Sequence, residues 1–211
     1  MKKALSLILM FALLSLFLVS CGKNKEIKAE PFSANISVDT SDHVLHHIEI
    51  SVEGYGKITL ALDETVAPIT VKNFVDLANS GYFDGLSFIR MQEGFVIQGG
   101  QSDKACDTIK GEFASNGVEN NLSHTKGVIS MARTDEPDSA SSQFFIMLED
   151  NEGLDGDYAA FGWVTSGMNV IEAICDDITS EAYDTSSYNR YIMGFLKEDY
   201  QPKITTIKVI D

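Results

Sequence analysis

Short apolar runs, separated by glycine-rich or polar turns, dominate the chain between residues 43 and 211. Residues 48–52 and 58–62 alternate apolar and polar side chains on either side of Gly54 and Gly56, which is typical of a β-hairpin. Further short runs stand at 95–97, 127–132, 143–148, 160–164 and 204–210. A series of short strands of this kind predicts a mainly β barrel or sandwich.

Two helices are expected among these strands. Apolar residues recur at helical spacing between Pro68, which fits a first helical turn, and Gly81, which suits a helix end. These residues are Val71, Phe74, Val75 and Ala78. A second helix fits residues 168–174. We therefore predict one domain over residues 43–211, with helices plugging the open ends of its sheet structure.

The first 20 residues have the layout of an export signal. Lys2 and Lys3 precede an apolar stretch over residues 4–17. The uncharged run over 4–19 is shorter than the roughly 20 residues that span a bilayer, which excludes a multi-span membrane protein. The quartet at 18–21, Leu-Val-Ser-Cys, resembles the bacterial lipobox. That resemblance implies cleavage before Cys21, acylation of its sulfur and attachment to a bacterial membrane by lipid; a plain secretory signal or a single anchor helix are the alternatives.

The polar residues 21–42 are expected to form the lipidated N-terminus and a flexible tether. The chain carries 31 acidic and 16 basic side chains, a formal charge of −15. Removal of residues 1–20 takes away two lysines and leaves −17. Such a charge repels phosphate backbones, so we expect no nucleic-acid partner and no membrane contact except through the lipid. No coiled-coil pattern is present, and a monomer is expected.

Several common chemistries lack their sequence patterns. The chain contains no glycine-rich phosphate loop, no His-Glu-x-x-His and no Gly-x-Ser-x-Gly. Its histidines, His43, His46, His47 and His124, have no accompanying metal-ligand spacing and are interpreted as solvated polar residues. Residues 150–157 lack the glycine and glutamate positions of a calcium loop and are interpreted as a polar turn. We therefore expect neither a metal nor a cofactor.

Two segments combine polar and aromatic residues within expected strands. In residues 88–100, Arg90, Val96 and Gln98 share one alternation parity and are expected on one face. Residues 127–134 and 142–146 contribute a second polar and aromatic group. Together the segments predict an aromatic floor surrounded by an arginine and two amides.

These segments resemble the cyclophilin family of peptidyl-prolyl cis-trans isomerases. Further collinear matches stand at 56–63, 67–74, 122–127 and 154–162, so the resemblance covers most of the domain. It implies a closed eight-stranded antiparallel β-barrel with a helix capping each end. It also implies an enzyme that acts on proline-containing polypeptides, here during the folding of exported proteins.

Such an enzyme requires no nucleophile. Rotation about a peptide bond faces a barrier of roughly 18–20 kcal/mol, while the two X-Pro isomers differ by only about 0.5–1 kcal/mol. A cation aimed at the amide nitrogen stabilises the twisted state, in which that nitrogen accepts a hydrogen bond more readily. The resemblance assigns catalysis to Arg90 and Gln98 and substrate binding to Phe95, Val96, Ala132, Arg133, Gln143, Phe145, Leu154 and Tyr158.

Other interpretations remain open at this point. Arg90 in an acidic protein is also suited to a surface ion pair, and Phe95 and Phe145 to plain core packing. Tyr158 stands where many members have a pocket histidine, and Gly153 where those members have a tryptophan. These departures favour the alternative of a non-catalytic binder of proline-containing segments. The presence of Arg90, Phe95, Gln98, Gln143 and Phe145 counts against it and favours the isomerase. A solute-binding lipoprotein fits the anchor but lacks the usual two-domain length.

Two features lie outside the resemblance. Cys106 and Cys175 fall outside the matched motifs, and the sequence leaves their pairing open. Residues 181–200 form an insertion rich in tyrosine and other apolar residues. Packing over the barrel and contact with a client or partner are its two interpretations.

Overall fold

The computed structural model describes residues 26–211. The expected export signal and the lipid site at Cys21 lie outside these residues. Within the described part of the chain, none of the helices has the length and apolarity needed to cross a bilayer.

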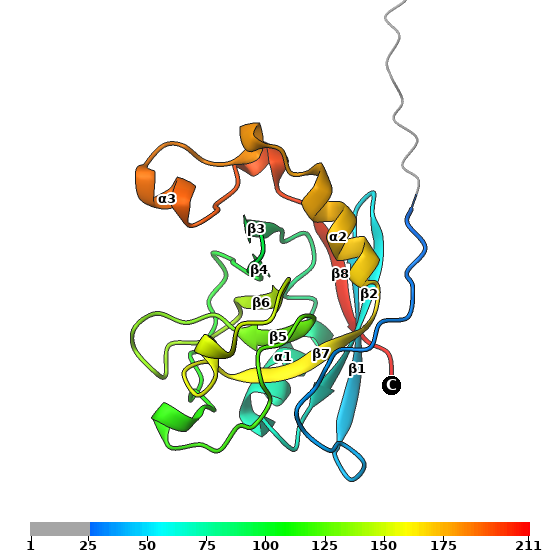
Figure 1. Ribbon diagram of the computed structural model, residues 1–211, viewed down its shortest axis with the longest axis vertical. Helices are drawn as coiled ribbons and strands as arrows, with labels where there is room; N and C mark the ends of the chain where they lie inside the picture. Colours follow the sequence, from blue (N-terminus) through cyan, green and yellow to red (C-terminus); the bar gives the residue numbers. More distant parts are fainter. Residues whose placement is uncertain (1–25) are drawn as a thin grey trace, which may run out of the picture.

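Eight strands form one antiparallel sheet that curls around the core (Figure 1). The strands follow one another across the sheet in the order β3-β4-β6-β5-β7-β2-β1-β8. Their bounds are Leu45–Val52 (β1), Gly56–Asp63 (β2), Phe88–Gln92 (β3), Val96–Gly99 (β4), Val128–Met131 (β5), Phe144–Met147 (β6), Ala160–Ser166 (β7) and Ile204–Val209 (β8). The predicted mainly β class and the opening hairpin are both present.

The sheet is a curled half-barrel, and the closed barrel of the prediction is matched only in part. Its edge strands β3 and β8 meet near their ends, where Ser87 forms an isolated bridge with Lys203. Backbone bonds join the same segments: Phe88 N donates to Pro202 O at 2.9 Å, Ile204 N to Leu86 O at 2.7 Å and Gly85 N to Ile204 O at 2.9 Å. Beyond that point the outer edge of β3 pairs with another segment, since Leu196 N donates to Ile89 O at 2.9 Å. The backbone groups that would complete the barrel are therefore already used.

Both predicted helices are present, and a third, short helix is added. Helix α1 (Pro68–Asn79) packs on β2 and β8, and α2 (Met168–Asp177) packs on β2. The N-cap residue Ala67 has no side-chain acceptor, and Glu112 supplies it instead: its buried carboxylate accepts bonds from Ile69 N and from Thr70 N and Oγ1. Helix α3 (Tyr188–Ile192) lies in the insertion before β8.

The inside of the half-barrel is filled by aromatic rings. Phe74 of α1 lies 4.9 Å from Phe83, 5.4 Å from Phe144 and 5.3 Å from Phe161, measured between ring centroids. All four side chains are fully buried. Because protein interiors are packed this densely, a ligand has to bind on the outer face of the sheet or at its rim.

The expected tether is not free over its described part. Pro31 forms a bridge with Ser166, and Phe32 N donates to Thr165 O at 2.8 Å. The side chains of Phe32, Ala34, Ile36 and Val38 all pack against the domain. We call residues 26–38 the N-terminal strap (blue in Figure 1). It lies on the domain because alternate apolar side chains face the same way in an extended chain.

The two described cysteines, Cys106 and Cys175, are free thiols. Burial raises the pKa of the Cys175 thiol to about 12 and also raises that of Cys106. Both thiols are therefore protonated near neutral pH, when cysteine is a poor nucleophile.

Candidate active site

A pocket of about 250 Å³ opens on the face of the sheet formed by β3, β4 and β6. It is lined by Arg90, Phe95, Val96, Gln98, Ala132, Arg133, Phe145, Leu154, Tyr158, Met193 and Phe195. All predicted catalytic and substrate-binding residues except Gln143 are among them, and Gln143 is hydrogen-bonded to Gln98. The structure thus brings together residues from five separate stretches of the chain.

Strand register places the polar residues side by side. Arg90 of β3 pairs with Gln98 of β4, and Gln98 pairs in turn with Phe145 of β6. Directly paired residues in neighbouring strands point to the same face, so these three side chains form a row across the sheet. The alternation seen in the sequence is the reason that Val96 lies on this face as well.

The Arg90 guanidinium is held by three acceptors. Nη1 donates to Gln98 Oε1 at 3.0 Å, Nη2 donates to Gln92 Oε1 at 2.7 Å, and Nε donates to the carbonyl of Met193. Gln98 Nε2 donates at 3.0 Å to Gln143 Oε1. This chain of bonds fixes the plane of the guanidinium and the orientation of the Gln98 amide.

Arg90 is not a surface ion-pair residue. No carboxylate among residues 26–211 forms a salt bridge with it. Burial lowers the pKa of Arg90, although an arginine keeps its charge at neutral pH. An unpaired, partly desolvated cation at the edge of an apolar pocket interacts strongly with any lone pair placed beside it.

Aromatic side chains form the floor and walls of the pocket. Phe145, only 5% exposed, lies 5.8 Å from Tyr158 in an edge-to-face arrangement. Phe95 lies beside the cation, with its ring centroid 5.9 Å from the guanidinium carbon of Arg90. The site therefore offers an uncharged slot directly next to a positive charge.

The backbone role predicted for Ala132 is restricted by the fold. Ala132 N donates to Gln143 O at 2.9 Å, so only its carbonyl is left to contact a bound peptide. The Arg133 side chain turns back onto the protein, over the rings of Tyr158 at 4.8 Å and Phe113 at 5.0 Å. Its Nε donates to Asp157 O at 2.9 Å. Arg133 thereby stabilises the wall of the pocket.

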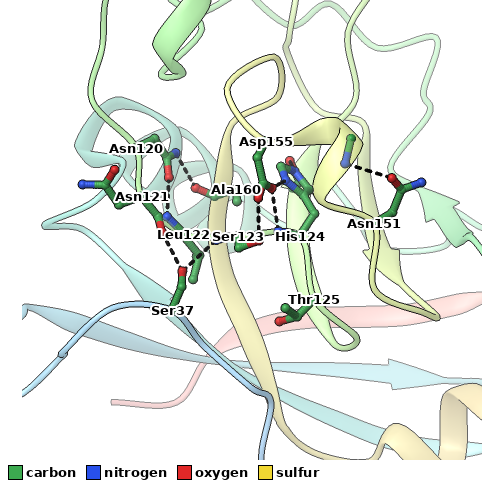
Figure 2. Close-up of polar contacts among 12 residues, drawn as sticks. Ser37, Asn120, Asn121, Leu122, Ser123, His124, Thr125, Asn151, Asp155 and Ala160 are labelled. Carbon is green, nitrogen blue, oxygen red and sulfur yellow. Dashed lines mark hydrogen bonds and ion pairs between the residues drawn. The ribbon is translucent and has the colours of Figure 1, made fainter.

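His124 corrects the interpretation of all four histidines as solvated residues. It is 1% exposed and stacks beneath Phe145 at 6.1 Å. Its Nδ1 lies 2.7 Å from Asp155 Oδ1 (Figure 2). On the other side of the ring, Nε2 lies 3.0 Å from Ser130 Oγ. The sequence offers one sign of this structural role, since His124 lies within residues 122–127, a segment that resembles the family.

The support extends outward to the N-terminal strap. Figure 2 shows Asp155 held by Ser123 and His124, and Ser37 of the strap beside them. Ser37 Oγ donates to Asn121 O at 2.6 Å and accepts from Ser123 N at 3.0 Å. The loop that carries His124 is therefore fixed from both sides.

Two residues of the pocket, Met193 and Phe195, are not among those predicted from the sequence. Both belong to the insertion and line the pocket beside Arg90. No motif marks them. Only the apolar composition of the insertion pointed to a surface of this kind, as its client-contact interpretation stated.

The fold and the site define a class of protein in which a curled antiparallel sheet carries an aromatic-lined pocket beside a fixed cation. A family model described as cyclophilin type peptidyl-prolyl cis-trans isomerase/CLD matches residues 47–196. The chain belongs to this family and is a peptidyl-prolyl cis-trans isomerase.

Curated relatives agree with this assignment, and a solved structure shares the fold. Peptidyl-prolyl cis-trans isomerase A of Dickeya dadantii is 44% identical over 149 residues, which cover 68% of this chain and 76% of that protein. An isomerase of Acinetobacter baylyi is 40% identical over 152 residues, covering 66% and 78% respectively. The crystal structure of a cyclophilin-type isomerase of Cryptosporidium parvum superposes with a TM-score of 0.65 at 23% identity, covers 80% of this chain and 99% of that one, and shares the fold.

Proposed function

We propose that this isomerase turns X-Pro bonds in exported polypeptides at the surface of a bacterial membrane, to which a lipid on Cys21 attaches it. Arg90 and Gln98 act on the amide that rotates, and Phe95, Val96, Phe145, Leu154 and Tyr158 hold the proline ring. Its clients are proline-containing polypeptides in extended conformation.

The geometry around Arg90 carries the catalytic part of this proposal. Within residues 26–211 the guanidinium is fixed by uncharged acceptors only, so its charge is available to a substrate. When the X-Pro bond twists, amide resonance is lost and the nitrogen lone pair becomes an acceptor for that cation. The interaction is stronger in the twisted state than in either planar isomer, which is the condition for catalysis.

The polar partners of Arg90 complete the proposed site. Gln98 is held between Arg90 and Gln143, with its amide at the rim of the pocket. From there it contacts the carbonyl that precedes the proline nitrogen. The carbonyl of Ala132, which also lines the pocket, accepts a backbone N–H from the residues before the proline. These contacts hold one side of the bond while the other side turns.

The membrane location is supported by the sequence of residues 1–21. Two lysines, an uncharged apolar stretch and a Leu-Val-Ser-Cys quartet occur in the order of a lipoprotein signal. Two or three acyl chains give stable attachment, whereas a single chain anchors only marginally. The formal charge of −15 keeps the domain itself away from anionic headgroups.

A proline-limited refolding assay with the fragment from Gly22 onward tests the catalytic proposal. The parent is expected to accelerate the slow phase, and Arg90→Ala to reduce kcat/KM at least about 100-fold, as loss of a transition-state donor does elsewhere. Lys72→Ala, an exposed cation on α1, is the control and keeps parental activity. Full activity of Arg90→Ala contradicts the mechanism. Peptide binding by the parent without acceleration supports the non-catalytic binder instead.

Mass spectrometry of the full chain expressed in a bacterium tests the anchor. The mature protein is expected to begin at Cys21 and to carry acyl chains, and Cys21→Ser to lose them. A mature N-terminus without lipid contradicts the lipoprotein and supports a plain secretory signal. An uncleaved chain retained in the membrane supports the single anchor helix.

A further inference from the structure

We infer that Tyr188, Tyr191, Ile192 and Met193 form a second substrate subsite, which binds large apolar side chains two to four residues after the proline of a client. We call these four residues the ledge. The inference rests on the proposed function and adds a substrate preference to it.

The ledge is attached to the strand that carries Arg90. Phe195 forms a bridge with Arg90, and Met91 N donates to Gly194 O at 2.9 Å. Gly194 has a φ of +77°, and a Cβ at this position would lie 2.2 Å from Met91 O. The backbone therefore reaches this close only because residue 194 has no side chain. Figure 1 shows the result, with α3 beyond β3 at the upper left of the view.

The segment that carries the ledge has a defined conformation before any client arrives. Ser187 caps α3 by accepting from Arg190 N at 3.2 Å. The Arg190 guanidinium pairs with Asp184 and lies 4.6 Å from the ring centroid of Phe195. Hydrogen bonds from Ser186 and Arg190 lower the pKa of Asp184 to about 2, so this pair stays charged over the whole working range of pH. A surface fixed in this way loses little entropy on binding.

The ledge is apolar and exposed to solvent. Its exposed fractions are 77% for Tyr188, 49% for Tyr191, 47% for Ile192 and 47% for Met193. The other large apolar side chains exposed among the described residues are scattered: Val44, Ile69, Tyr200 and Ile210. A concentration of this kind on an otherwise polar surface marks a binding site.

Continuity with the pocket identifies the occupant. Met193 belongs to the ledge and also lines the proline pocket, and its carbonyl accepts from Arg90 Nε. A chain that occupies the pocket and passes over Arg90 therefore meets Met193 next. The occupant is the same client polypeptide, and an apolar surface selects an apolar side chain on it.

The order of the strands gives the direction. Ala132 follows β5, on one side of β6 and β4, whereas β3 and the ledge lie on the other side. If Ala132 contacts the residues before the proline, as proposed, then the residues after it run toward β3. Strands lie about 4.8 Å apart and an extended chain advances about 3.3 Å per residue. The two strand spacings from β6 to β3 therefore correspond to about three residues.

Matched peptides test the inference. The set contains one proline with leucines at the second to fourth positions after it, the same peptide with serines there, and a third with leucines before the proline. The parent is expected to isomerise the first peptide with a kcat/KM about five- to tenfold higher than the second, the factor for partial burial of one apolar side chain. The Tyr191→Ser/Ile192→Ser double variant brings that ratio to near one.

A control variant and a binding measurement separate the possible failures. Ile69→Ser, which removes an exposed apolar side chain from α1, keeps the parental ratio. A parental ratio near one, or an equal preference for leucines before the proline, overturns the inference and leaves the isomerase standing. If no peptide is isomerised, calorimetry measures the binding affinity of the parent for the same three peptides. Tighter binding of the first peptide then supports the ledge, although the proposed catalysis has failed. A parent that dimerises through the ledge, shown by a monomeric double variant, also overturns the inference.

Discussion

His124 Nδ1 lies 2.7 Å from Asp155 Oδ1, directly beneath the ring of Phe145. Burial lowers the pKa of His124, and the nearby Asp155 carboxylate only partly opposes that effect. Burial also acts to raise the pKa of Asp155, but hydrogen bonds from Ser123 and His124 outweigh it, so that this pKa is lowered. The native pair is therefore a neutral imidazole that donates from Nδ1 to a carboxylate.

The stability of the protein is expected to fall as the pH is lowered from 7 to 5. The pKa of His124 is 6.5 or near it in the unfolded chain and lower in the native one, so below about pH 6.5 the unfolded chain binds more protons. One such group gives a slope of at most about 1.4 kcal/mol per pH unit. Urea unfolding, followed by the fluorescence of the single tryptophan Trp163, measures it. His124→Gln is expected to flatten the slope.

His46 provides the control for this pH dependence because its sign is opposite. A hydrogen bond that His46 donates to the Glu64 carboxylate raises the pKa of His46 against the effect of its burial. The stabilisation is therefore complete below pH 6.5 and is lost above it. His46 is partly exposed, and its contribution is small. His46→Gln should leave the decrease toward pH 5 in place. A flat profile in His46→Gln but not in His124→Gln would contradict the assignment.

Gln98→Ala is expected to lower kcat/KM by roughly 10- to 100-fold, because it frees Arg90 Nη1 and removes the amide that contacts the substrate carbonyl. Gln92→Ala removes a different acceptor of Arg90, outside the pocket lining, and is expected to cost less than about tenfold. Isomerisation of a short X-Pro peptide measures both. Equal losses in the two variants would mean that Gln98 acts only by holding Arg90.

Glu112→Ala is expected to lower the free energy of unfolding by about 2–4 kcal/mol, since three donors at the start of α1 lose a buried charged acceptor. Glu112→Gln keeps an acceptor oxygen, so its free energy of unfolding should lie between those of the parent and of Glu112→Ala. Glu119→Ala, an exposed neighbour in sequence, is the control and should change stability by less than about 0.5 kcal/mol. Urea midpoints measure all three variants. A harmless Glu112→Ala would show that water replaces the carboxylate at this helix end.

Removal of the N-terminal strap is expected to destabilise the domain. A fragment that begins at Asp39 exposes the surface now covered by Phe32, Ala34, Ile36 and Val38, at a cost of at least about 2 kcal/mol for these partly buried side chains. The fragment from Gly22 is the reference, and thermal unfolding compares the two. Coincident unfolding curves would show that the strap lies on the domain without stabilising it.

Local patterns in the sequence correctly predicted the features that depend on local backbone geometry, namely strand alternation and helix positions. The parity of Arg90, Val96 and Gln98 gave their common face correctly, because strand alternation is fixed by the backbone. The helices at Pro68 and Met168 followed from spacing and turn residues. The strap was missed although its alternation is visible in the sequence, since polar residues between its apolar ones suggested a linker.

Long-range pairing was out of reach of such patterns. Closure of the barrel is limited because residues 194–196 occupy the edge of β3, and nothing near β3 in sequence indicates this. Burial of His124 depends on Asp155 and Ser130, which only the fold brings together. Met193 and Phe195 reach the pocket for the same reason. The family resemblance supplied the remaining site residues, which spacing alone would not have selected.

If the proposed lipid anchor is present, the N-terminal strap also limits where this enzyme can work. Ile27 N donates to Tyr55 O at 2.6 Å, so the chain is already fastened to the domain at that residue. With the lipid proposed on Cys21, only residues 21–26 separate the bilayer from this first attachment, and six residues extend to about 20 Å at most. The catalytic domain would then reach only those polypeptides that lie in a layer next to the membrane, and this layer would be little thicker than the domain itself. Polypeptides would meet it as they leave the membrane, and chains already released would escape it.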